Sequence, residues 1–225
     1  MIDIETNIKQ ALQAISDCID THPFFNCNDL PLSKLDLVVD KIKSQYPDLE
    51  RDKFYAYRLR KAGKASHRLI VYQPETDKDI EGFFVLLSSQ MDENKKFWKE
   101  ATNKETRLVV YGYELVKKTR PGASKPAWTW RINKNRFEKH KQQITNAVIQ
   151  KKFDWLKEFA KSTKNWPGFS GVREQHFELK KHLYKVISQN AKKEAQGFYL
   201  EWPRLAYVTR RVYGKNKEAE RKENV

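Results

Sequence analysis

The chain has 225 residues, of which 39% are hydrophobic, 32% charged and 12% aromatic. This length can bury the core of one large domain or two small ones, and the aromatic content excludes a disordered chain. The two cysteines, Cys18 and Cys27, exclude a disulfide scaffold and are typical of a reducing compartment. The first residues lack a signal-peptide pattern, and no apolar stretch approaches the ~20 residues of a membrane span. We therefore expect a soluble, cytoplasmic protein with no membrane partner.

The net charge of +15 favours a polyanionic partner, because basic groups release counterions when they bind phosphates. This charge is distributed unevenly. Residues 1–52 hold 5 Lys and Arg against 10 Asp and Glu, whereas residues 53–225 hold 39 against 19. Within residues 104–152 the ratio is 13 to 3. The basic surface is therefore expected on this part of the chain.

Residues 1–50 are predicted to form an acidic helical pair. In the first helix four apolar residues share one face, at spacings of four, three and four: Ile8, Leu12, Ile15 and Ile19. Ser33 and Asp36 resemble a capping box ahead of a second helix that ends before Pro47. The pair could be a dimerisation arm, a docking element for a protein partner or a lid on a sheet. We favour the lid, since elements adjacent in sequence usually pack together.

The next segment is predicted to be mainly strand. Residues 54–60 and 67–72 read as a hairpin with a basic turn containing Gly63, and residues 82–87 form an apolar run typical of a buried central strand. A short helix is expected over residues 92–101. With the hairpin that follows, these strands predict one mostly antiparallel sheet of about five strands.

The segment from Arg107 to Phe137 is the strongest functional signal. Two β-rich runs flank a connection with Pro121, Gly122 and Pro126, which is typical of a hairpin with a long tip. The tip has four bases and no acid: Lys117, Lys118, Arg120 and Lys125. A basic ribbon of this kind can follow a phosphate backbone or enter a groove.

The C-terminal part is predicted to be helical and then extended. One helix is expected over residues 134–161 and another from Ser170 or Gly171, ending at Gly197. Residues 198–212 read as one or two strands, and residues 214–225 as a disordered charged tail. The prediction is an α+β protein with an acidic helical segment at 1–50, a basic nucleic-acid-binding domain at 51–213 with helices packed on the sheet, and the tail.

Aromatic residues interleave with the bases of the hairpin. Trp128 and Trp130 could stack bases of a single strand, yet strand alternation favours core packing for both, with Thr129 and Arg131 facing outward. The helix after Gly171 could read base edges through its first-turn polar residues, although a solvated helix start explains them more simply. These residues are Arg173, Glu174 and Gln175.

The sequence gives little support for a catalytic site or a metal site. Glu93 and Lys95 with Asp77 or Asp79 resemble a carboxylate-metal nuclease only loosely, because Glu93 is better explained as a first-turn acid of a helix. The trio of Cys18, His22 and Cys27 lacks a fourth ligand and the paired spacing of zinc sites. We therefore predict no catalytic residue, no metal site and no cofactor.

The sequence favours a non-catalytic nucleic-acid-binding protein, with duplex DNA the first choice over RNA. An accessory or regulatory role in a plasmid, phage or other mobile element is a hypothesis reached by elimination. The alternatives are a metal-dependent nuclease or other nucleic-acid-processing enzyme using Asp79, Glu93 and Lys95, and a protein-interaction adaptor that docks or self-associates through residues 1–50. The predicted nucleic-acid-binding residues are Arg107, Lys117, Lys118, Arg120, Lys125, Arg131, Lys134, Arg136, Arg173, Arg210 and Arg211.

Overall fold

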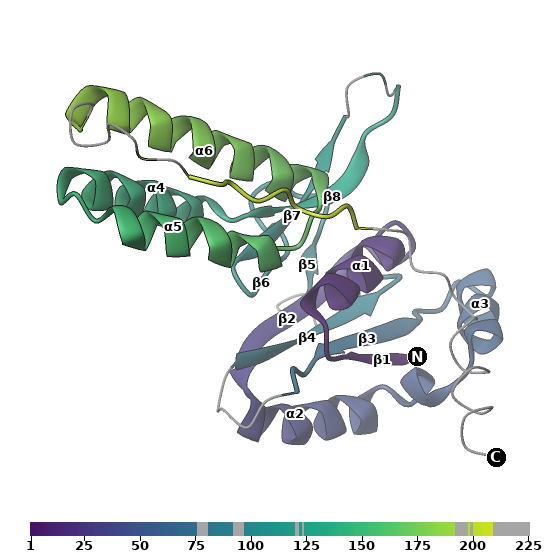
Figure 1. Ribbon diagram of the computed structural model, residues 1–225. Coiled ribbons are helices and arrows are strands. Elements are labelled where there is room, and N and C mark those ends of the chain that lie inside the picture. Colours follow the sequence, from purple (N-terminus) through teal and green to yellow (C-terminus); the bar gives the residue numbers. More distant parts are fainter. Residues whose placement is uncertain are drawn as a thin grey trace, which may run out of the picture.

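The computed structural model describes residues 1–75, 81–91, 97–119, 122, 124–191, 198 and 200–208 (Figure 1). These residues form an α+β fold with two sheets, and the C-terminal helices pack on strands. The larger sheet has five strands in the order β1-β3-β4-β2-β5, and it is mixed because β1 runs parallel to β3. The smaller sheet, β6-β7-β8, is antiparallel. The prediction of one mostly antiparallel sheet is therefore corrected to two sheets.

The first part of the chain builds the five-stranded sheet and three helices. Its elements are β1 (Ile2–Glu5), α1 (Ile8–Cys18), β2 (Phe24–Pro31), α2 (Leu32–Gln45), the 3-10 helix η1 (Pro47–Glu50), α3 (Lys53–Lys61), β3 (His67–Tyr72), β4 (Glu81–Ser88) and β5 (Lys99–Glu100).

Helices α1 and α2 cover opposite faces of this sheet, so the expected helical pair does not exist as a unit (Figure 1). The alternation of β4 shows why. Phe83, Val85 and Leu87 pack in the cluster that contains α1, whereas Phe84 and Leu86 pack in the cluster that contains α2. Each helix covers the sheet, but the two do not form the expected lid, because they lie on opposite faces. Strands from residues 1–50 pair with β3 and β4, so this acidic segment shares its sheet with later residues.

The predicted strand over residues 54–60 is wrong, because these residues form α3. The side chain of Asp52 caps the helix by accepting a hydrogen bond from the Tyr55 N–H at 2.7 Å. Gly63 has a φ of +69° and ends the helix, with the Lys64 N–H bonded to the Leu59 carbonyl at 2.9 Å. Local capping therefore outweighs the aromatic content that favoured a strand. The helix expected over residues 92–101 is also corrected at its end, where β5 pairs with β2.

The second part holds the smaller sheet and the remaining helices. Its elements are β6 (Val109–Val110), β7 (Tyr113–Lys118), β8 (Ala127–Ile132), α4 (Lys134–Ile149), α5 (Phe153–Ser162), the 3-10 helix η3 (Thr163–Asn165) and α6 (Ser170–Asn190).

Three predictions in this part are corrected. The helix expected over residues 134–161 is divided into α4 and α5, and Lys151 between them has a φ of +56°. Residues 200–208, called here the 200–208 segment, form no strand; this segment runs beside the C-terminal helices in Figure 1. The helix expected to end at Gly197 is shorter, because α6 ends at Asn190 and Ala191 is not helical. The tail 214–225 lies outside the described residues.

Within the ranges that the structure describes, no helix is both long enough and apolar enough to cross a membrane.

Candidate nucleic-acid interface

Strands β7 and β8 form the predicted hairpin, called here the ribbon, and Trp130 anchors it to α1. The Trp130 side chain is fully buried, and its indole N–H lies 2.8 Å from both the Leu12 carbonyl oxygen and Ser16 Oγ. Trp128 is only partly buried and donates its indole N–H to Asp20 at 2.8 Å. Core packing is therefore confirmed for Trp130, whereas Trp128 lies at the edge of the core.

The second face of the ribbon is covered by α6, which corrects the prediction that Thr129 faces outward. Thr129 is buried, with its hydroxyl 2.8 Å from Ser170 Oγ. The two backbones approach closely, since a Cβ added to Gly171 would lie 2.5 Å from the Trp130 carbonyl oxygen. The Gln175 side chain bonds both backbone groups of Ile132 at the same contact. The ribbon is thus held between α1 and α6.

A groove on the α6 side of the ribbon, called here the ribbon groove, is lined by five of the predicted binding residues. It has a volume of about 540 Å³, and the cations that line it are Arg107, Lys117, Lys118, Arg131 and Lys134. Acids accompany them. Buried Glu114 lies between Arg107, at 3.6 Å, and Arg131, while Glu174 pairs with Lys118. The groove is therefore positive but partly neutralised.

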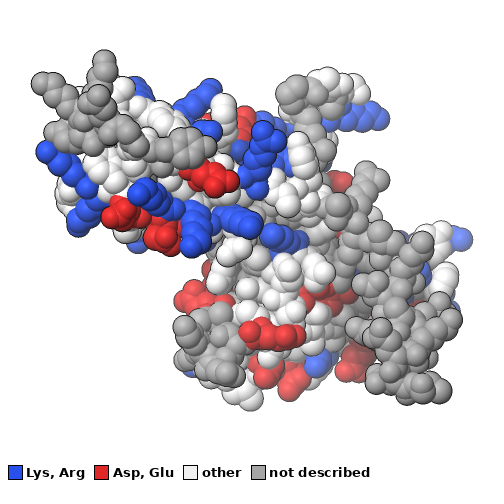
Figure 2. Space-filling view, viewed as in Figure 1, with Lys and Arg blue, Asp and Glu red and all other residues white. Residues whose placement is uncertain are grey.

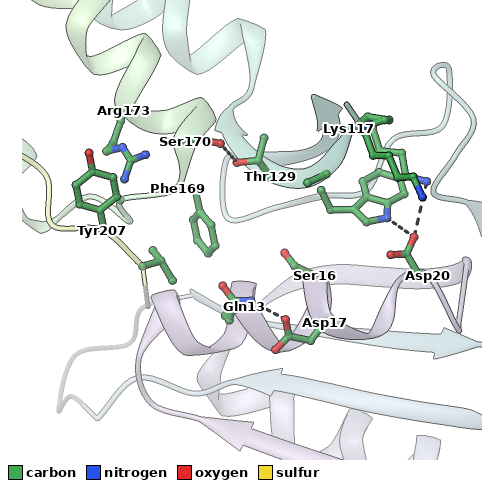
Figure 3. Close-up of a pocket in the computed structure, with 16 residues that line it drawn as sticks. Gln13, Ser16, Asp17, Asp20, Lys117, Thr129, Phe169, Ser170, Arg173 and Tyr207 are labelled. Carbon is green, nitrogen blue, oxygen red and sulfur yellow. Dashed lines mark hydrogen bonds and ion pairs between the residues drawn. The ribbon is translucent and has the colours of Figure 1, made fainter. Parts of the chain in front are cut away.

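A second cavity, called here the central pocket, lies between α1, β8 and the start of α6 (Figure 3). Its volume is about 620 Å³, and three predicted residues line it: Lys117, Lys125 and Arg173. Lys117 Nζ lies 3.7 Å from Asp20 and 4.7 Å from the centre of the Trp128 ring. Figure 3 shows this group at one end of the pocket and Arg173 beside Tyr207 at the other.

A third cavity, called here the segment pocket, lies between α6 and the 200–208 segment and has a volume of about 510 Å³. Its lining was not predicted as a site, although Arg173 belongs to it. The sequence signal that could have found it is the alternation of aromatic and basic residues on two separate segments. The residues that line it are Arg173, His176, Phe177, Lys180, Trp202, Pro203, Arg204, Leu205 and Tyr207.

Arg136 is separated from these cavities and supports the fold. Tyr111 and Gly112 form a two-residue turn between β6 and β7, with φ values of +50° and +76°. The Arg136 guanidinium donates to the Tyr111 carbonyl at 2.9 Å and lies 5.5 Å from the Tyr113 ring centre. The structure thus uses this predicted binding residue to hold a turn.

Several predicted residues lie outside the described part of the chain. They are Arg120, Arg210 and Arg211 of the basic set, and Asp77, Asp79, Glu93 and Lys95 of the nuclease hypothesis.

The described residues contain no cluster of three or more His, Cys, Asp or Glu side chains that could hold a metal ion. His22 instead lies 2.8 Å from Thr21 Oγ1 and 3.2 Å from Ser66 Oγ. Burial raises the pKa of both Cys18 and Cys27 to about 11, so neither thiol ionises readily at neutral pH. The arrangement offers protein hydrogen bonds in place of a metal.

The charged residues are distributed unevenly between the two parts of the fold. Residues 134–190, which span α4 to α6, hold 13 Lys and Arg against 5 Asp and Glu. Figure 2 shows Lys and Arg gathered over these helices, while Asp and Glu predominate around α2. Comparison with protein-family models, curated proteins and solved structures found no match to this chain. Charge and geometry are therefore the grounds for inferring its function.

Proposed function

We propose that this protein binds nucleic acid, DNA in the first instance, without catalysing a reaction on it. The observation that carries the proposal is the clustering of cations around the ribbon. Seven of the predicted binding residues line the ribbon groove and the central pocket, and Lys117 lines both. Phosphates carry the charge that such a surface attracts, and a protruding ribbon can follow a sugar-phosphate backbone. The proposed role is that of an accessory or regulatory DNA-binding factor.

The acids in these grooves do not prevent phosphate binding. The side chains of Lys117, Lys118 and Glu174 are each about half exposed, and Asp20 is more exposed. Pairs of this kind contribute only about 0.2–1 kcal/mol in water, so a phosphate can replace the carboxylate. Around Glu114 two arginines share one carboxylate, which leaves an excess of positive charge.

Duplex DNA and single strands both present a backbone to this surface. The sequence favoured the duplex partly because two basic hairpins were expected. The structure has one basic ribbon, with α3 in place of the other hairpin. The remaining support for DNA is the ribbon itself and the basic helices beside it.

The test is fluorescence-anisotropy titration of labelled duplex DNA, single-stranded DNA and RNA at several salt concentrations. Alanine replacement of Lys117, Lys118, Arg120 and Lys125 should weaken binding and lower the salt slope by up to about 3 to 4, close to one for each lost phosphate contact.

The matched control removes the same charge from the acidic part of the molecule, by alanine replacement of Lys9, Lys34, Lys41 and Lys43. This control should retain most of the affinity. Equal losses in the two variants would mean that only net charge matters, and a wild-type slope in the ribbon variant would show that the ribbon is not the site.

A further inference from the structure

The segment pocket differs from the other two cavities in its chemistry. Three cations line it, Arg173, Lys180 and Arg204, and its lining has no Asp or Glu among the residues that the structure describes. Three aromatic side chains share the lining: Phe177, Trp202 and Tyr207. Its volume of about 510 Å³ falls within the roughly 300–1,000 Å³ range of small-molecule sites. The pocket therefore combines positive charge with aromatic walls and, unlike the ribbon groove, has no carboxylates to neutralise it.

Hydrogen bonds hold the 200–208 segment in place beside α6. The Trp202 indole N–H donates to His176 Nδ1 at 3.2 Å, and His176 Nε2 lies 2.8 Å from Thr163 Oγ1. Thr163 donates its hydroxyl proton to the Ala160 carbonyl at 2.6 Å, so it accepts the proton of Nε2. This series of hydrogen bonds requires His176 to be neutral, because its Nδ1 accepts a hydrogen bond. Burial and the nearby Lys180 lower the pKa of His176 to about 4, which keeps the ring neutral at pH 7.

A close backbone contact between Gly168 and Ala206 also holds the same segment. A Cβ added to Gly168 would lie 1.6 Å from the Ala206 carbonyl oxygen, so only glycine allows this approach. The pocket wall is thus fixed at two points, Trp202 and Ala206. The aromatic groups are positioned before any ligand binds.

Two of the aromatic side chains at the pocket are well exposed to solvent. Phe177 is 54% exposed and Tyr207 is 76% exposed. The Arg173 guanidinium lies 3.7 Å from the Tyr207 ring centre, and Lys181 Nζ lies 4.7 Å from that of Phe177. Flat rings next to cations are the groups with which proteins stack unpaired bases and hold the adjacent backbone.

We propose that the segment pocket binds an unpaired nucleobase, stacked on Phe177 and Tyr207, while Arg173, Lys180 and Arg204 contact the flanking phosphates. This inference rests on the proposed function and adds a preference for single-stranded over duplex nucleic acid. Paired bases inside a duplex cannot reach the rings, because their faces are already stacked.

The position of the pocket supports a continuous path for a single strand. The segment pocket and the central pocket share Arg173 and Tyr207 as lining residues. The central pocket in turn shares Lys117 with the ribbon groove. A strand with a base in the segment pocket can therefore extend past Arg173 toward the cations of the ribbon.

The experiment measures the affinity of three labelled probes for the full chain: an oligothymidine strand, an abasic strand of the same length and a duplex. The test variant is Phe177→Ala with Tyr207→Ala. Tyr184→Ala is the matched control, because Tyr184 is 44% exposed on the same helix and does not line the pocket. Circular dichroism on each variant verifies folding, and Lys180→Gln with Arg204→Gln is a second test that leaves the rings in place.

The wild-type protein should bind oligothymidine about tenfold or more tightly than the abasic strand, as expected for stacking of one or two bases. The Phe177 and Tyr207 variant should lose this discrimination and keep its duplex affinity, while Tyr184→Ala behaves as wild type. Lys180→Gln with Arg204→Gln should weaken both single strands alike. Equal wild-type binding of the thymidine and abasic strands, or an unchanged preference in the aromatic variant, would overturn the base-binding pocket and leave the proposed function standing. Failure of all three probes to bind would overturn the proposed function itself.

Discussion

The part built on the five-stranded sheet and the part built on the ribbon with α4 to α6 use their charged residues differently. The described residues up to 101 hold 12 Lys and Arg against 13 Asp and Glu, while those from 107 to 191 hold 18 against 6. The sheet part is almost neutral and buries α1 and α2 on its two faces. The ribbon part carries the excess charge on a sheet of only three strands, which helices must support.

The ribbon, which carries much of the basic surface, depends on the helices that pack against it. A small sheet is marginal alone, so the ribbon relies on Trp130 against α1 and on the close approach of Gly171 in α6. The cations are exposed on elements that α1 of the sheet part helps to hold. Substitutions at the supporting residues should therefore lower stability, while substitutions at the exposed charged residues should change binding alone.

Trp130→Ala should have the largest effect. Removal of a fully buried tryptophan leaves a cavity between the two parts and removes its hydrogen bonds to Leu12 and Ser16, with an expected loss of about 3–5 kcal/mol in the free energy of unfolding. Urea unfolding measures it. The matched control is Trp128→Ala, which should lose less because that side chain is only partly buried. Similar losses of unfolding free energy in the two variants would mean that Trp130 does not hold the sheet part and the ribbon part together.

Low pH should destabilise both parts of the fold, because each contains a buried histidine whose pKa is lowered. Burial, with Arg60 and Arg68 nearby, lowers the pKa of His22 to about 4, and burial lowers that of His176 to about 4. Because the unfolded chain binds these protons at pH 6.5, the free energy of unfolding should fall as the pH drops from about 6.5 to about 4.

Nuclear magnetic resonance titration of the imidazole signals measures this effect, with the variants His22→Gln and His176→Gln to assign them. Titration of both rings near pH 6.5 would contradict the buried, neutral state.

Gly171→Ala should loosen α6 from the ribbon. The added Cβ would lie 2.5 Å from the Trp130 carbonyl oxygen, and overpacking of this kind typically costs about 1–3 kcal/mol. Thermal unfolding measures the loss, and Ser188→Ala at an exposed position of the same helix is the control. A gain in stability, as expected for alanine at an unconstrained helical site, would show that the contact can relax.

Glu174→Gln should have the smallest effect, on binding alone. Loss of the carboxylate releases Lys118 for phosphate and should tighten nucleic-acid binding by roughly two- to fivefold, the equivalent of an exposed pair. Glu178→Gln makes the same charge change in the same groove and is the control. An equal gain in both variants would indicate a general charge effect and no specific release of Lys118.

The elements that local sequence predicted well are those with complete local signals. The ribbon has two β-rich runs and a proline-glycine tip, β4 is an uninterrupted apolar run, and α2 ends before Pro47. The capping box predicted for the start of α2 is wrong, because the helix begins at Leu32 with Pro31 at its N-cap and no side-chain cap. The prediction of a strand over residues 54–60 was wrong because their aromatic content favours strands, whereas the helix there depends on the caps at Asp52 and Gly63. Seven of the predicted binding residues line the ribbon groove and the central pocket. Three of them, Lys117, Lys118 and Lys125, belong to the basic tip, whose exposure needs no tertiary information.

The α+β class, the segregation of charge, the ribbon and the burial of Trp130 could be predicted from the sequence, since each follows from composition or from periodicity over a few residues. The division into two sheets, the placement of α1 and α2 on opposite faces and the segment pocket became visible only in the folded protein. These features join residues far apart in the chain, such as Ile2 with Leu69, and Phe177 with Arg204. Pairing at that separation depends on packing of the whole chain, and local patterns carry no information about it.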